Sequence, residues 1–197
     1  MGLARTAGCR LHPFIMTDVE TSLAASRALV LVSHGGVPKD MPRTLLKEMR
    51  QLHAAGHGQG AASEQSRKRA EELEAKVRNW PRTPESDPYQ AGVQSLGREL
   101  ARVLPEDTEL VLAYNEFCAP SIQDAIADLV AKGIRTIDVV TTMMTPGGSH
   151  SERDIPEALN EARARFPEAR IDYLWPYDMA GLAKLVAAQV AAKRSEA

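Results

Sequence analysis

The stretch ELVLAYNEFCAPSIQDAIADLVAKGIRTIDVVTTMM at residues 109–144 decides the fold, because it holds two apolar runs separated by one amphipathic segment. The runs at 109–114 and 136–144 are typical of buried parallel strands. Between them, apolar residues of 121–132 recur every three or four positions, and Gly133 provides a helix stop. The stretch therefore predicts a parallel strand–helix–strand unit with a right-handed crossover.

The same alternation extends in both directions along the chain. ALVLV at 28–32 and ARIDYLW at 169–175 are further apolar runs that predict strands. Amphipathic helices are predicted at 90–104, 152–166 and 178–193. Strands alternating with helices predict an open α/β sheet of about four parallel strands, whose ligands bind beyond the carboxyl ends of the strands.

Composition excludes several classes of protein. The 197 residues are 44% apolar and 25% charged, as in an ordinary globular domain, and the net charge of −2 gives no support for binding nucleic acid or a membrane surface. The sequence contains no run of eighteen apolar residues, so it predicts no transmembrane helix. Two cysteines, Cys9 and Cys118, form no disulfide framework, so we expect a cytoplasmic protein.

We expect a mobile N-terminal segment at 1–26, followed by a single α/β domain at 27–195. The first segment lacks the apolar stretch of a secretory signal. Either Met1 or Met16 could be the natural start of the chain, since the sequence from Met16 runs directly into the first strand.

The connection between the first two strands is far longer than one helix and two loops require. We assign 40–89 to a helical insertion, which is either an exposed hairpin with no active role or a lid or oligomer contact. His53 and His57 lie within it four residues apart, a spacing that suits a metal pair. Nearby glycines indicate that the helix ends there, which favours a solvated helix end over a metal site.

Three potential metal ligands follow three successive strands. His34 precedes two glycines, Glu116 lies in an apolar stretch where a carboxylate needs a partner, and His150 opens a helix after a glycine-rich turn. The carboxyl ends of parallel strands meet at one edge of a sheet. Two imidazoles and a carboxylate suit a divalent iron, cobalt, nickel or zinc ion, and three ligands leave coordination positions open for exchange.

These motifs resemble the short, single-domain form of the class II chelatase family, the sirohydrochlorin chelatases. The resemblance covers roughly 28–38 and 90–190. It rests on three matching motifs: His34-Gly35, Glu116 with Pro120-Ser121, and Gly148 with His150 and Asp154-Ile155-Pro156. The resemblance implies a doubly wound, flavodoxin-like parallel sheet with a helical insertion after strand one. It also implies a homodimer.

The resemblance further implies an enzyme that inserts Fe²⁺, for sirohaem, or Co²⁺, for cobalamin precursors, into a tetrapyrrole. The absence of a G-x-x-x-x-G-K-[ST] motif disfavours an ATP-driven reaction. His34, Glu116 and His150 would hold the metal, with Glu116 as a plausible proton acceptor. No cofactor is expected beyond the divalent metal substrate. These residues do not indicate whether iron, cobalt or nickel is the physiological metal.

Groups that could anchor the substrate's carboxylates lie near the strand ends. The basic candidates are Lys39, Arg43 and Arg153, although each of them taken alone is better explained as a solvated surface charge. The main-chain N–H groups of Gly147, Gly148 and Ser149 are further candidates, because they precede a helix.

Other functions compete with a chelatase. A non-catalytic metal or tetrapyrrole carrier would use the same three side chains, and the sequence does not separate it from an enzyme. A histidine phosphatase would need an arginine where Ser33 stands. A dinucleotide-binding module would need a G-x-G-x-x-G motif after a strand, which the chain lacks.

Overall fold

A computed structural model describes residues 25–56 and 63–196 of the chain. Most of the predicted mobile segment 1–26, including Met16, lies outside the described residues, as does His57. The side chain of His53 is likewise not described. Among the described residues, no helix is both long enough and apolar enough to cross a bilayer.

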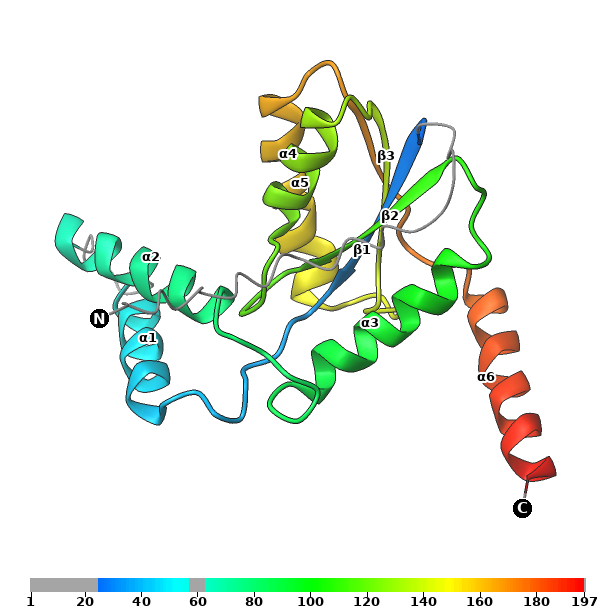
Figure 1. The fold of residues 1–197 in the computed structure, drawn as a ribbon, viewed down its shortest axis with the longest axis horizontal. Helices are drawn as coiled ribbons and strands as arrows, with labels where there is room; N and C mark the ends of the chain where they lie inside the picture. Colours follow the sequence, from blue (N-terminus) through cyan, green and yellow to red (C-terminus); the bar gives the residue numbers. More distant parts are fainter. Residues whose placement is uncertain (1–24, 57–62, 197) are drawn as a thin grey trace, which may run out of the picture.

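The core of the fold is a parallel sheet of four strands in the order β2-β1-β3-β4 (Figure 1). The strands are β1 (Arg27–Ser33), β2 (Thr108–Tyr114), β3 (Thr136–Thr141) and β4 (Arg170–Tyr173). The predicted α/β fold is therefore confirmed. The last two strands end earlier than predicted, so 142–144 and 174–175 belong to the loops that follow them.

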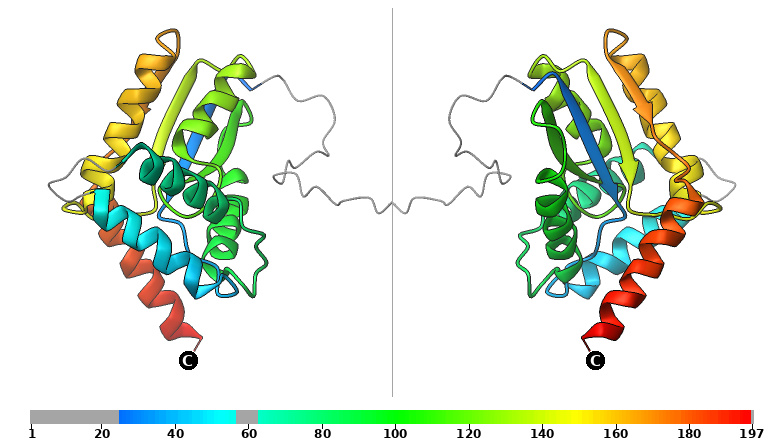
Figure 2. Two further views of the ribbon diagram at one scale, coloured as in Figure 1. Left: turned by 90° about the vertical axis from the view of Figure 1, so that its left-hand side faces the viewer. Right: turned by 90° about the vertical axis from the view of Figure 1, so that its right-hand side faces the viewer.

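Helices flank the sheet on both sides, as a doubly wound fold requires (Figures 1 and 2). On one face lie α4 (Ile122–Ala131) and α5 (Ile155–Arg165), the latter continuing from a π-helical turn, η1 (His150–Asp154). On the other lies α3 (Pro88–Ala101), whereas α6 (Met179–Ser195) extends away from the sheet, beyond the carboxyl ends of the strands. Successive side chains of β2 point to opposite faces of the sheet. Val111 packs against the apolar cluster beneath α4, and Leu112 packs against the cluster beneath α3.

The main core lies between the sheet and the helices α4 and α5. The apolar stripe predicted on α4 is confirmed, since all five of its residues are buried: Ile122, Ala125, Ile126, Leu129 and Val130. Val30, Val32, Ile137 and Val139 of the central strands are fully buried beneath this layer. Each fully buried aliphatic side chain of this kind contributes about 1.5–3 kcal/mol to folding.

The apolar stripe predicted on α3 is only partly buried, and no residue of the stripe predicted on α6 is buried. On α3, Val93 is buried, whereas Leu96 is 45% exposed and Val103 lies beyond the end of the helix, 78% exposed. The helix covers an edge strand, and Gly97 rather than a larger residue meets Leu112, because a Cβ there would come within 3.0 Å of it. No residue of α6 is buried.

The segment 40–89 contains a helical hairpin formed by α1 (Arg43–Gly56) and α2 (Glu64–Arg78). The hairpin has an apolar cluster of its own, which is separate from the main core and contains Met41, Leu45, Met49, Leu73 and Val77. Two partly buried aromatic residues pack against this cluster, Trp80 and Phe117. Phe117 belongs to the loop after β2, so the hairpin is joined to the carboxyl edge of the sheet.

Candidate metal site

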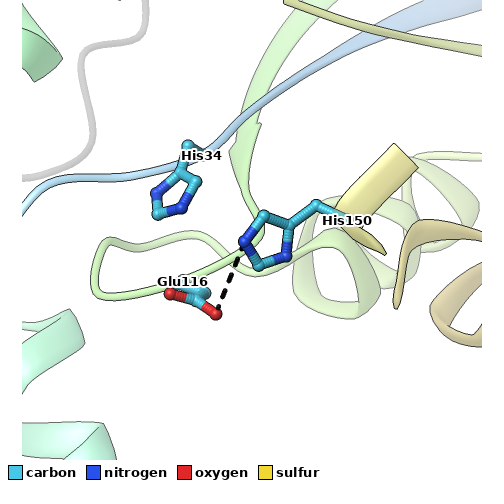
Figure 3. Close-up of side chains that lie close together, drawn as sticks. All are labelled: His34, Glu116 and His150. Atoms are coloured by element: carbon cyan, nitrogen blue, oxygen red, sulfur yellow. Dashed lines mark ion pairs between the residues drawn. The ribbon is translucent and has the colours of Figure 1, made fainter. Parts of the chain in front are cut away.

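The carboxyl ends of three adjacent strands bring His34, Glu116 and His150 together (Figure 3). His34 follows the central strand β1, Glu116 follows β2 on one side of it, and His150 follows β3 on the other side. One potential ligand atom from each residue lies within 4.8 Å of the other two, and all three residues are partly buried. The parallel sheet therefore places the three predicted residues at one point.

The spacing of these atoms suits a small divalent cation after a slight closure. Metal–nitrogen and metal–oxygen bonds of about 2.0–2.2 Å place two ligand atoms of one ion no more than roughly 4.4 Å apart. Nε2 of His150 and Oε1 of Glu116 are 3.9 Å apart, within this limit. The three ligand atoms all lie within 4.8 Å of one another, so binding of one ion by all three requires the side chains to come slightly closer together.

Each imidazole makes a contact through Nδ1 that leaves Nε2 for the centre of the site. His34 Nδ1 lies 2.8 Å from the carbonyl oxygen of Gly35, to which it donates when protonated. His150 Nδ1 lies 2.6 Å from Oδ2 of Asp154, one helical turn later. The side-chain amide of Asn115 is 2.8 Å from the same nitrogen. A carboxylate behind a histidine fixes the ring and raises its strength as a ligand.

Asp154 is held in the ionised form that this role requires. Burial alone would raise the pKa of its carboxyl, but hydrogen bonds from Arg153 and His150 outweigh burial and lower that pKa below its ordinary value. Asp154 belongs to the Gly148–Pro156 motif, but the sequence alone indicates no role for it. Its spacing of four residues from His150 within a helical segment is the signal that could have identified it.

Two main-chain features press the loops after β1 and β2 against each other. The N–H of Glu116 donates to the carbonyl of His34 over 2.8 Å, which continues the pairing of the strands. Gly35 has a φ of +95°, and a Cβ on it would lie 1.8 Å from the carbonyl oxygen of Glu116. Glycine is therefore required at position 35, because any side chain there would collide with the main chain of Glu116.

Tyr89, the second residue of α3, also reaches the site. The hydroxyl of Tyr89 lies 2.7 Å from Oγ of buried Ser33 and accepts a hydrogen bond from the main-chain N–H of His34 over 3.2 Å. Ser33 also contacts Thr142 Oγ1, 3.0 Å away. These bonds fix the main chain from which His34 projects. Tyr89 was not predicted as part of the site, because its contact with β1 is visible only in three dimensions.

Two arginines that sequence analysis also missed hold the loop of Glu116. Arg78, the last residue of α2, donates to the carbonyl oxygens of Asn115 over 3.1 Å and of Cys118 over 3.2 Å. Arg82 donates to the carbonyls of Phe117 and Gly36 and pairs with the carboxylate of Asp87. The residues on both sides of Glu116 are thus bound by the segment between β1 and α3.

A cavity of about 320 Å³ adjoins the candidate site. The end of α2 forms one wall, and the starts of α4 and α5 form another. Its polar lining includes Arg78, Asn115, Glu116, Gln123 and Asp154. Glu116 and Asp154, the hydrogen-bond partner of His150, therefore line the same cavity.

The predicted substrate anchors differ in their surroundings. Lys39 and Arg43 are exposed, and Arg153 Nε donates to Oδ1 of Asp154 over 2.9 Å. The N–H of Gly147 donates to the carboxylate of Glu152 over 2.7 Å, which occupies it, whereas Gly148 and Ser149 are exposed.

Comparison with known proteins identifies a family whose model, CbiX, matches residues 86–193. This match includes Glu116 and His150 but begins after His34. A sirohydrochlorin cobaltochelatase of Priestia megaterium is 36% identical over 60 residues, which are 30% of this chain and 19% of that protein. The match thus spans about a fifth of the relative's length.

Two solved structures match the chain at low identity. A CbiX protein from Marinobacter aquaeolei VT8 has a TM-score of 0.48 and 14% identity, covering 85% of this chain and 98% of that one. The sirohydrochlorin chelatase SirB from Bacillus subtilis subspecies spizizenii, in complex with cobalt, has a TM-score of 0.38 and 17% identity, covering 77% of this chain and 43% of that one.

Proposed function

The chain belongs to the CbiX family, and from this premise we propose that it is a sirohydrochlorin chelatase, which inserts Fe²⁺ or Co²⁺ into the tetrapyrrole without ATP. The observation that carries the proposal is the convergence of His34, Glu116 and His150. The name of the matched relative supports sirohydrochlorin as the substrate. The small number of cysteines supports a cytoplasmic location.

In the proposed reaction the metal ion is a substrate, held by Nε2 of the two histidines and by the Glu116 carboxylate. Three protein ligands leave coordination positions for the pyrrole nitrogens, so the ion passes from the protein to the macrocycle. Two pyrrole N–H bonds break, two metal–nitrogen bonds replace them, and two protons leave. The partly exposed Glu116 carboxylate accepts one of these protons, and solvent receives the other.

Sirohydrochlorin carries many carboxylates, which need local anchors because the protein itself has a net charge of −2. We assign this role to Lys39, Arg43 and Arg153, together with the exposed Gly148-Ser149 turn at the start of η1. Exposed cations and free N–H groups suit mobile carboxylate arms. The Gly147 N–H contributes only if Glu152 moves away.

We further propose that two copies of the chain form a homodimer. Support comes from α6, which carries Leu185, Val186 and Val190 at 58%, 57% and 46% exposure. Sedimentation velocity at micromolar protein concentration tests this assembly. A dimer is the expected result, and a fully active monomer would contradict it.

The central experiment measures metal insertion into metal-free sirohydrochlorin, without ATP, under anaerobic conditions. Iron(II), cobalt(II) and nickel(II) are compared, each against the reaction without protein and against the Glu116→Gln variant. We expect the wild-type protein to accelerate insertion of iron or cobalt, and the variant to lose most of this acceleration. Binding of metal and tetrapyrrole without acceleration would identify a carrier instead.

A further inference from the structure

The helical hairpin α1–α2 and the loop that follows it are attached to the loop after β2, at the residues surrounding Glu116. Arg78 and Arg82 make this attachment through main-chain carbonyls rather than through side chains. The carbonyls belong to Asn115, Phe117 and Cys118, so both neighbours of Glu116 in the sequence are bound.

Both guanidinium groups are placed to fix their partners firmly. The Arg82 side chain is only 5% exposed, and the Arg78 side chain is 18% exposed. Each is oriented by a carboxylate, Asp87 for Arg82 and Glu74 for Arg78. Charged donors make shorter and stronger hydrogen bonds than neutral ones, and low exposure limits competition from water.

Phe117 provides a third attachment, next to Glu116. Its ring packs against the apolar cluster of the hairpin, and its main chain has a φ of 56°, in the left-handed region that a residue with a side chain seldom adopts. An unfavourable conformation of this kind persists where surrounding contacts impose it. The hairpin cluster and Arg82 are the contacts that hold it here.

We propose that the inserted hairpin is the element that positions Glu116, with Arg78 and Arg82 as its positioning residues. It sets the carboxylate of Glu116 3.9 Å from Nε2 of His150, where one cation can contact both. The hairpin thereby acts as part of the metal site rather than as an appendage at its entrance. This inference rests on the proposed function, because it takes Glu116 as a ligand of the metal substrate.

The test is a titration of the full-length protein with cobalt(II), without tetrapyrrole, monitored by the visible absorption of the bound ion. The key variant is Arg78→Ala, and its matched control is Arg69→Ala. Arg69 lies on the same helix and pairs with Glu48 of α1 over 2.8 Å, within the hairpin and away from the Glu116 loop. Arg82→Ala would leave buried Asp87 unpaired and is expected to unfold the hairpin, so Arg78 carries the test.

We expect Arg78→Ala to weaken cobalt binding by about 10-fold or more, within the range found when outer partners of metal ligands are lost. Its cobalt spectrum should shift toward that of Glu116→Gln, while Arg69→Ala keeps the wild-type affinity and spectrum. Arg78→Lys should restore part of the loss, because a lysine can donate to one of the two carbonyls. The double variant Arg78→Ala/Glu116→Gln should bind no more weakly than Glu116→Gln alone.

The outcomes separate this inference from the proposed function. If wild-type protein binds cobalt and Glu116→Gln weakens binding, but Arg78→Ala behaves like Arg69→Ala, the inference is wrong and the metal site stands. Additive losses in the double variant would also overturn it, because Arg78 would then act independently of Glu116. If wild-type protein does not bind cobalt, the proposed function fails, and the inference fails with it.

Discussion

The imidazole rings of His34 and His150 meet edge to face, with their centroids 4.7 Å apart and their planes at 86°. Each ring is oriented by a separate acceptor, the Gly35 carbonyl for His34 and the Asp154 carboxylate for His150. Because both Nδ1 atoms are engaged, the two Nε2 atoms are the ones left to bind an ion. Both rings are thus oriented by contacts within the protein itself, which reduces the reorganisation that binding of an ion requires.

Replacing either histidine of this pair should nearly abolish metal insertion. We expect His34→Ala and His150→Ala to lower the insertion rate by at least roughly 100-fold, since even outer partners of metal ligands contribute about 10–100-fold. Both side chains are partly buried at the strand ends, outside the apolar core, so thermal unfolding should change little. Insertion is followed by the absorbance of the tetrapyrrole. Near wild-type turnover in either variant would remove that histidine from the site.

Asp154→Asn should weaken metal binding without removing a ligand. The amide keeps the shape of the carboxylate but lacks its charge, so His150 becomes a poorer ligand. We expect cobalt(II) affinity to fall by about 10-fold. Asp172→Asn is the control, because Asp172 pairs with exposed Arg170 on β4 rather than with the site. Equal cobalt affinities for the two variants would contradict the role assigned to Asp154.

Two glycine variants separate backbone strain from a clash with the site. Gly35 and Gly133 have similar φ values of +95° and +92°, but an added Cβ meets the Glu116 carbonyl only at Gly35, and nothing within 4 Å at Gly133. Both alanine variants should lose about 1–2 kcal/mol of stability from the left-handed conformation.

Gly35→Ala must also push the Glu116 main chain away from His34. We therefore expect it to lower cobalt(II) affinity by about 10-fold, while Gly133→Ala leaves that affinity unchanged. Urea unfolding and cobalt titration of both proteins provide the comparison. Unchanged cobalt affinity in a folded Gly35→Ala protein would show that the close approach of the two loops is unimportant for the site.

Tyr173 should make the protein less stable at alkaline pH. Burial, followed by the influence of Tyr177, raises the pKa of Tyr173 from 10.0 to about 12. Between these values the unfolded chain loses the proton and the folded chain keeps it, so the free energy of unfolding falls as the pH rises. Tyr173→Phe should show a shallower fall over this range, measured by urea unfolding. Parallel curves for the two proteins would contradict the shift.

Local patterns were sufficient to predict the sheet and the three central side chains. The apolar run before His34 and the stripe on α4 have the periodicity of the buried elements that they form. Because consecutive parallel strands share a carboxyl edge, the sequence also predicts that His34, Glu116 and His150 meet. Asp154 was accessible by the same reasoning, through its spacing from His150.

The remaining features depend on contacts that sequence periodicity does not contain. An apolar stripe predicts which face of a helix could be buried, but no described residue of α6 is buried in the single chain. The bonds of Arg78 and Arg82 to the Glu116 loop join residues 35–40 positions apart, through main-chain carbonyls that every residue possesses. No residue type marks such an acceptor in advance.

The strand order means that formation of the complete sheet during folding depends on the first strand, β1. β2 and β3 are linked by a single helix but do not pair with each other, because β1 occupies the position between them. Until β1 enters, both strands present unpaired edges that could join another chain. Pairing of β1 with β2 joins segments that are far apart in the sequence, because the whole hairpin lies between them. Such non-local pairing is slow. His34 arrives with β1, so recovery of cobalt binding during refolding would time the closure of the sheet.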